Sequence, residues 1–161
     1  MKTVAAIAFA LIASPALSLS CLRPDIVRMY EQARDAEAGY WLVRGQLFSN
    51  TPLATPQPEP DGRFKDNASA DSTAQFQGQG LHRDGFRDIP DTDITVTITC
   101  LAHWCGGVPL EEDLFMAIEV TETGPVLLAP PCSSRVIRFS KENEARLLRC
   151  AIEGVCSSQG N

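Results

Sequence analysis

The sequence has 161 residues, of which 44% are hydrophobic and 21% charged, and its formal net charge is −6 with the histidines neutral. An acidic surface repels phosphate backbones and anionic lipid, so nucleic acid and acidic membranes are disfavoured as partners. After the first 20 residues no stretch approaches the length of apolar chain that a membrane-spanning helix needs, so no later span is expected.

The N-terminal residues have the layout of an export signal. Lys2 supplies a positive charge, and an uninterrupted apolar run follows from Val4 to Ala13. This run has the length of a signal-peptide core and is too short to cross a bilayer. Small residues at the −3 and −1 positions place cleavage after residue 18 or residue 20. We therefore predict a signal peptide over residues 1–18 and a single domain over 19–161, located in the periplasm or secreted.

The chain contains six cysteines, all after the predicted signal. An even number in a small exported domain is typical of disulfides, so we predict three. The sequence favours one local pair, Cys150 with Cys156, because the chain can fold back after Gly154, and leaves the other pairings open. The predicted disulfide cysteines are Cys21, Cys100, Cys105, Cys132, Cys150 and Cys156.

The first elements after the signal are predicted to be a helix and a strand. Pro24 suits the first turn of a helix, and apolar residues recur at helical spacing until Gly39, which predicts an amphipathic helix over residues 24–38. Tyr40 to Phe48 is rich in aromatic and β-branched residues and predicts a strand, in which Gly45 marks a bulge or a close-packing point.

Residues 49–74 contain four prolines among Ser, Thr, Asp, Asn and Ala. Such a segment has little to bury, so a flexible surface loop is predicted. The helix and strand before it are too little to form a core of their own. The segment is therefore expected to be a long insertion within one domain, functional or merely tolerated, and not a linker between two.

The second half of the chain predicts short strands and a closing helix. In Asp93 to Leu101, apolar residues alternate with threonines, a period of two that indicates a half-buried strand. Ser140 is the expected N-cap of the last helix and Gly154 its end. Further strands are predicted at 75–81, 114–120, 126–128 and 135–139, and the buried stripe of the last helix at Leu148, Ala151, Ile152 and Val155.

About six short strands with a helix at each end predict a mainly β fold of the α+β class. The sheet must curl to hide its apolar face, which favours a small, partly open antiparallel barrel stapled by disulfides.

One motif resembles part of a redox site. Trp104-Cys105-Gly106 directly follows the Asp93–Leu101 strand and resembles the start of a thioredoxin active site. The second cysteine of that motif would fall at Val108, so a structural disulfide through Cys105 is the favoured interpretation. A thiol-disulfide oxidoreductase using Cys105 is kept as an alternative.

Other chemistries lack their residues. The two histidines, His82 and His103, are in no ligand spacing, so no metal site is predicted. Residues 88–93 contain three aspartates but lack the glycine and distal glutamate of a calcium loop, and a solvated acidic turn is expected there. No nucleophile elbow or phosphate-binding loop is present in the sequence. No catalytic residue and no cofactor is therefore predicted.

Two resemblances bear on fold and role. The strand ending in Cys100, then Trp104-Cys105-Gly106, a strand at 114–119 and Pro131-Cys132 resemble a group of small uncharacterised exported proteins of alphaproteobacteria. More remotely, the order of helix, strand and cysteines is similar to netrin-like modules, shared with tissue inhibitors of metalloproteinases, which implies an OB-like barrel. Those inhibitors begin with Cys-x-Cys, whereas Cys21 is followed by Leu22 and Arg23, so the second cysteine is missing and inhibition by that route is not expected.

The expected role is that of an exported, non-enzymatic binding module for a protein or a small ligand, through the barrel face or the proline-rich loop. Two alternatives differ in class. One is the oxidoreductase using Cys105, and the other is a lipid-anchored envelope component in which Cys21 is acylated.

Overall fold

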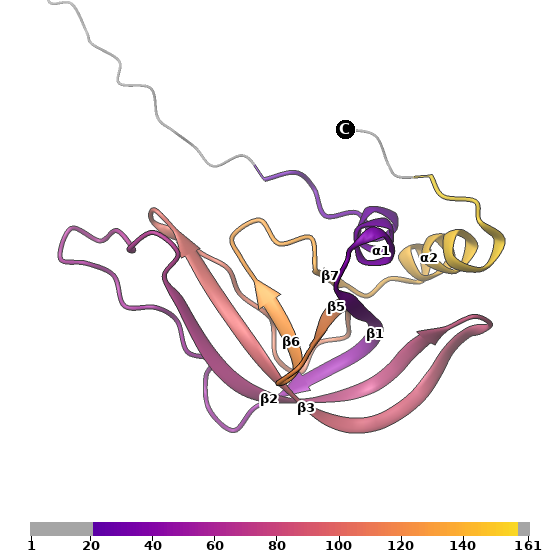
Figure 1. Ribbon diagram of the computed structural model, residues 1–161, viewed down its shortest axis with the longest axis horizontal. Coiled ribbons are helices and arrows are strands. Elements are labelled where there is room, and N and C mark those ends of the chain that lie inside the picture. The colour runs from indigo at the N-terminus through magenta and orange to yellow at the C-terminus, as the bar shows by residue number, and fades with distance from the viewer. Residues whose placement is uncertain (1–20, 158–161) are drawn as a thin grey trace, which may run out of the picture.

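The computed structural model describes residues 21–157 (Figure 1), so the predicted signal peptide lies outside the described residues. Seven strands and two helices make up the described fold. In chain order they are α1 (Ile26–Asp35), β1 (Gly39–Phe48), β2 (Ser69–His82), β3 (Gly85–Leu101), β4 (Trp104–Cys105), β5 (Leu114–Thr121), β6 (Gly124–Ala129), β7 (Val136–Arg138) and α2 (Lys141–Glu153).

The strands form a ring. The sheet runs in the order β1-β2-β3-β6-β5, and β1 also pairs with β5, which returns the order to its start. β7 pairs with β5 and β4 with the end of β3. The predicted mainly β fold with flanking helices and disulfides is confirmed, and the sheet is partly ring-like. The sheet is not wholly antiparallel, however, because β3 and β6 run parallel.

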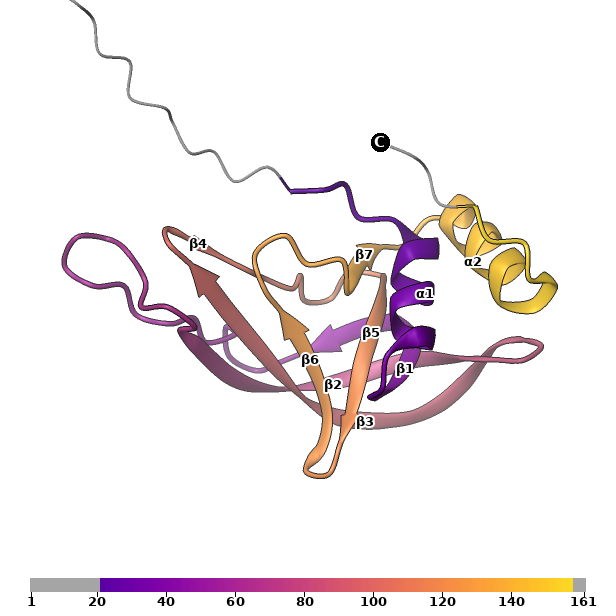
Figure 2. The same ribbon diagram turned by 45° about the horizontal axis from the view of Figure 1, so that its top comes forward.

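Two apolar clusters hold the ring and the helices together. One fills the inside of the ring, and the other lies between its outer face and the two helices. β5 belongs to both, because Leu114, Met116 and Ile118 point into the ring while Phe115 and Ala117 point toward the helices. The continuous apolar run Leu114–Ile118 is therefore buried on both faces. Figure 2 shows α1 and α2 together on the outside of the ring, near β1, β5 and β7.

Both helices differ from the prediction in their limits or their phase. α1 starts at Ile26, because Asp25 is the N-cap whose carboxylate accepts the N–H groups of Val27 and Arg28. α2 has the predicted cap at Ser140 and a left-handed Gly154 at its end. Its buried side chains are Leu147 and Cys150, so the predicted stripe is wrong, and Ile152 and Val155 are exposed (47% and 55%).

β2 and β3 form a long hairpin, and both strands are longer than predicted. β2 begins at Ser69, so the proline-rich loop ends six residues earlier than expected. Residues 88–93 lie within β3 and do not form the expected acidic turn. A change of register places Pro90 and Asp91 opposite the single residue Gln77. This bulge tolerates proline, which cannot donate to a sheet ladder.

The proline-rich loop makes backbone contacts with the rest of the fold. The Phe64 N–H donates to Ala102 O, and the Leu53 side chain packs against the cluster inside the ring. Figures 1 and 2 show the loop at one end of the long hairpin, with the hairpin turn projecting from the ring at the other end.

Three disulfides close the fold. Cys150–Cys156 confirms the predicted local pair, at the end of α2. Cys100–Cys105 joins β3 to β4, and Cys21–Cys132 links two positions 111 residues apart. Cys132 has a φ of 61°, in the left-handed region that non-glycine residues rarely adopt.

Candidate functional site

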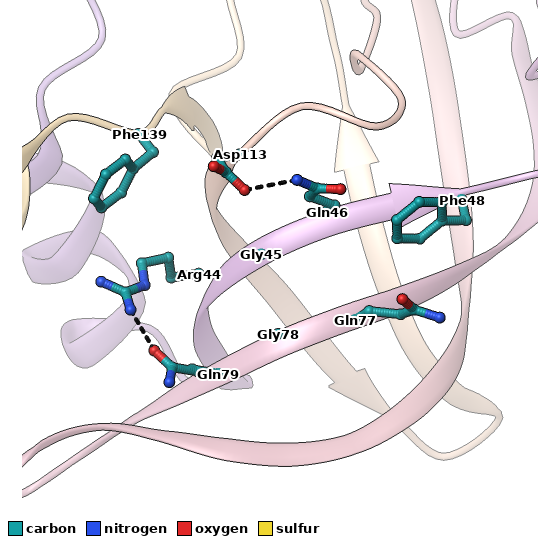
Figure 3. A pocket seen from close by; sticks show the side chains of 9 residues that line it. All are labelled: Arg44, Gly45, Gln46, Phe48, Gln77, Gly78, Gln79, Asp113 and Phe139. Carbon is teal, nitrogen blue, oxygen red and sulfur yellow. Dashed lines mark hydrogen bonds between the residues drawn. The ribbon is translucent and has the colours of Figure 1, made fainter.

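A groove of about 500 Å³ lies on the outer face of the ring, across β1 and β2 (Figure 3). Side chains alternate between the faces of a strand, so Val43 and Leu47 point into the ring and the residues between them at even numbers point out. We call this the carboxamide groove. Its lining residues are Arg44, Gly45, Gln46, Phe48, Gln77, Gly78, Gln79, Asp113 and Phe139.

Two glycines bring the strands together beneath the groove. Gly45 and Gly78 are cross-strand partners. A Cβ on Gly45 would lie 2.1 Å from Gln77 O, and a Cβ on Gly78 would lie 2.2 Å from Arg44 O. Both directions are also closed by the Phe76 ring inside the ring of strands. Only glycine fits at either position, which confirms the predicted close-packing point at Gly45.

Replacing Gly45 with alanine is expected to lower the free energy of unfolding by about 3 kcal/mol, because backbone atoms cannot move aside as a side chain can. Gly107→Ala is the matched control, since nothing lies within 4 Å of its Cβ direction, and its effect should stay within about 0.5 kcal/mol. Urea unfolding of both variants checks the difference. Equal stabilities would show that the strands do not approach at Gly45.

Arg44 fixes one wall of the groove. Its guanidinium carbon lies 5.2 Å from the centre of the Phe86 ring and 5.3 Å from that of Phe139. It forms an ion pair with Glu144 on α2 and donates to Gln79 Oε1 at 2.5 Å. The arginine is therefore stacked, neutralised and hydrogen-bonded, and it connects β1 to β2 and α2.

Three glutamines line the groove with their orientations fixed. Gln46 Nε2 donates to Asp113 Oδ1, Gln77 Nε2 to Gln75 Oε1, and Gln79 Nε2 to Asp88 Oδ1, each at 2.8 Å. Gln46 and Gln77 are cross-strand partners on the same face. In the described part of the chain, their carbonyl oxygens accept no hydrogen bond. The groove thus offers two free acceptors held by their own amide groups.

Tyr40, on the first part of β1, is held by two contacts. The Tyr40 hydroxyl donates to Glu119 Oε2 at 2.8 Å, and the Arg135 guanidinium lies over the Tyr40 ring, 5.1 Å from its centre. Burial and the hydrogen bond to Glu119 raise the pKa of Tyr40 above its ordinary value of 10.0. The folded protein therefore keeps this phenol protonated at a pH where the unfolded chain loses the proton.

This difference makes stability depend on alkaline pH. Above pH 10 the folded state binds more protons than the unfolded state, so the free energy of unfolding should fall as pH rises. Tyr40→Phe removes this contribution. Urea unfolding between pH 9 and 11 should show a steeper fall for the natural protein than for the variant, and parallel curves would contradict the raised pKa.

The cysteines and histidines singled out in the sequence lie outside the carboxamide groove. All six cysteines form disulfides, and no free thiol is present over residues 21–157. Cys105, bonded to Cys100, follows an exposed Trp104 at the far end of β3. His82 and His103 lie beyond opposite ends of β3, and His103 Nδ1 lies 3.0 Å from Gly62 O. Residues 21–157 contain no cluster of three or more possible metal ligands.

The sequence interpretation missed the carboxamide groove. Its signal was present as the even-numbered polar residues of β1, beside the Gln-Gly repeat of β2. The pairing of Gly45 with Gly78 could not be predicted from the sequence. This register depends on a loop of twenty residues between β1 and β2.

Comparison with models of protein families, with curated proteins and with solved structures found no match. Within residues 21–157, none of the helices combines the length and the apolar character needed to cross a membrane.

Proposed function

We propose that this protein is an exported, non-enzymatic binding module that holds a neutral, hydroxyl-rich ligand, such as a short carbohydrate segment, in the carboxamide groove. The observation that carries the proposal is the pair of free carbonyl oxygens on Gln46 and Gln77, held on one face by hydrogen bonds through their amide nitrogens. Hydroxyl groups can donate to such fixed acceptors without bringing a charge into the site.

The charges of the groove disfavour an anionic ligand, because its arginine is already paired and its aspartate stays negative. Arg44 is already paired with Glu144, and Asp113 accepts the amide of Gln46. Phe48 and Phe139 add aromatic surface on either side of the polar strip (Figure 3). This combination suits a ligand with hydroxyl edges and an apolar ring face. A volume of about 500 Å³ is in the usual range for small-molecule sites.

A binding role is favoured over a catalytic one because the central groups are carboxamides, which neither ionise near neutral pH nor act as nucleophiles. Three disulfides support export to an oxidising compartment. The disulfides also disfavour the two alternatives, an oxidoreductase using Cys105 and a lipid anchor on Cys21. Both sulfur atoms are bonded to other cysteines.

Isothermal titration against cellotetraose, maltotetraose and chitotetraose tests the proposal. At least one should bind saturably, and Gln77→Leu should weaken it at least tenfold, because one free acceptor is removed. The matched control is Gln57→Leu, an exposed glutamine of the proline-rich loop, which should leave affinity unchanged. Cleavage of a bound oligosaccharide that stops in Asp113→Asn would overturn the non-enzymatic role, and a panel without binding would overturn the ligand class.

A further inference from the structure

A cleft opens where β1 and β2 diverge, away from the carboxamide groove. β1 pairs with β2 only from Val43 onward, whereas residues 39–42 pair with β5 alone. Backbone N–H and C=O groups alternate in direction along a strand. Two of these four residues therefore direct both groups toward the cleft, where no strand of the described chain receives them.

The cleft has a hollow on each side of this strand edge. The first hollow measures about 350 Å³ and contains Trp41, Ile89 and Pro90 over Gly80. The second, about 450 Å³, lies toward the helices and contains Tyr30 and Ala33 of α1. Both hollows belong to one opening, because they share four lining residues: Tyr40, Leu42, Leu81 and His82.

The two hollows differ in chemistry. Trp41 is 40% exposed and lies among apolar neighbours in the first hollow. In the second, the charged or titratable lining residues other than the tyrosines are Arg34, His82 and Arg83, and none is acidic. Arg34 is paired with Asp35, at 2.6 Å. Arg83 is exposed and forms no hydrogen bond or ion pair with any described residue.

We propose that this cleft binds an extended peptide segment of another protein as an added strand beside the first residues of β1, with apolar and acidic side chains in alternation. An unpaired strand edge selects an extended backbone, and pockets on its two sides select alternate side chains. One set would enter the hollow around Trp41, and the other would face Arg83. This site goes beyond the carboxamide groove and shares none of its residues.

The first test uses the acetylated, amidated peptide VEVEVEV with the mature protein carrying Trp104→Phe, which leaves Trp41 as the only tryptophan reporter. We expect a saturable change in Trp41 fluorescence and slower hydrogen exchange at residues 39–42. Two further peptides carry N-methyl groups on the valine or on the glutamate amides. At least one should bind tenfold more weakly, because the methyl groups remove the backbone donors on one edge.

The second test exchanges the charge of the rim. Arg83→Glu should weaken VEVEVEV at least tenfold and create binding to VKVKVKV, whereas Arg63→Glu, an exposed arginine of the proline-rich loop, should change neither. Binding of both N-methylated peptides as tight as that of VEVEVEV would overturn strand addition. Unchanged peptide preference in Arg83→Glu would overturn the charge assignment. A Trp41 signal that depends on protein concentration without peptide would assign the cleft to a second copy of this chain and overturn the proposal.

Failure here is distinguishable from failure of the proposed function. Oligosaccharide binding and the Gln77→Leu variant test the carboxamide groove. Peptide binding, Trp41 fluorescence and the Arg83→Glu variant test the cleft, so either proposal can fail without the other.

Discussion

Removing the Cys21–Cys132 disulfide is expected to lower the free energy of unfolding by about 4 kcal/mol. This bond joins positions 111 residues apart and therefore restricts the unfolded chain over most of its length. The Cys150–Cys156 bond spans only 6 residues, so its loss should cost about 2 kcal/mol. Urea unfolding of the Cys21→Ala/Cys132→Ala and Cys150→Ala/Cys156→Ala variants measures both. Equal losses would show that chain restriction is not the source of the stabilisation.

The backbone at Cys132 allows a finer comparison. Its φ of 61° is unfavourable for alanine but not for glycine. Cys21→Ala/Cys132→Gly should therefore be about 1 kcal/mol more stable than Cys21→Ala/Cys132→Ala. A less stable glycine variant would mean that the left-handed conformation exists only while the disulfide holds it.

The Asp25→Ala variant is expected to lose about 3 kcal/mol of unfolding free energy. The Asp25 carboxylate is only 6% exposed, caps α1 through the N–H groups of Val27 and Arg28, and lies 2.6 Å from Arg146 Nη2 on α2. Alanine leaves the helix uncapped and Arg146 without its carboxylate. The loss should appear in urea unfolding and as reduced helix content near α1.

Asp25→Asn separates the two roles, because asparagine is also a good N-cap but carries no charge. The free energy of unfolding of Asp25→Asn should lie between those of the natural protein and of Asp25→Ala. Adding Arg146→Met to Asp25→Asn should recover part of the lost stability. A loss equal to that of Asp25→Ala would assign the whole effect to the ion pair.

Much of the fold could be predicted from local patterns. The alternation of apolar residues with threonines before Leu101 predicts the second half of β3. Ser140 and Gly154 predict the limits of α2. These signals are local, since a strand period or a helix cap depends on neighbouring residues. The phase of α2 could not be predicted in this way, because its contact with α1 decides that Leu147 and Cys150 are buried.

The candidate sites depend on distant residues. The carboxamide groove needs Gly45 opposite Gly78, and the cleft needs β1 to leave β2 before Val43. Neither register is visible in a single segment. The same is true of the Cys21–Cys132 bond, whose partners lie 111 residues apart in the sequence. A strand pairing of this kind follows from packing over the whole ring and from turn geometry.

The most direct measurement of binding in the carboxamide groove is a heteronuclear NMR titration of the side-chain amides with the three neutral tetrasaccharides. Gln46, Gln77 and Gln79 should shift together and saturate with one of the sugars, while Gln57 in the proline-rich loop stays unchanged. Shifts confined to residues outside the groove, or no saturable shift with any of the sugars, would contradict the proposal that the groove is the binding site.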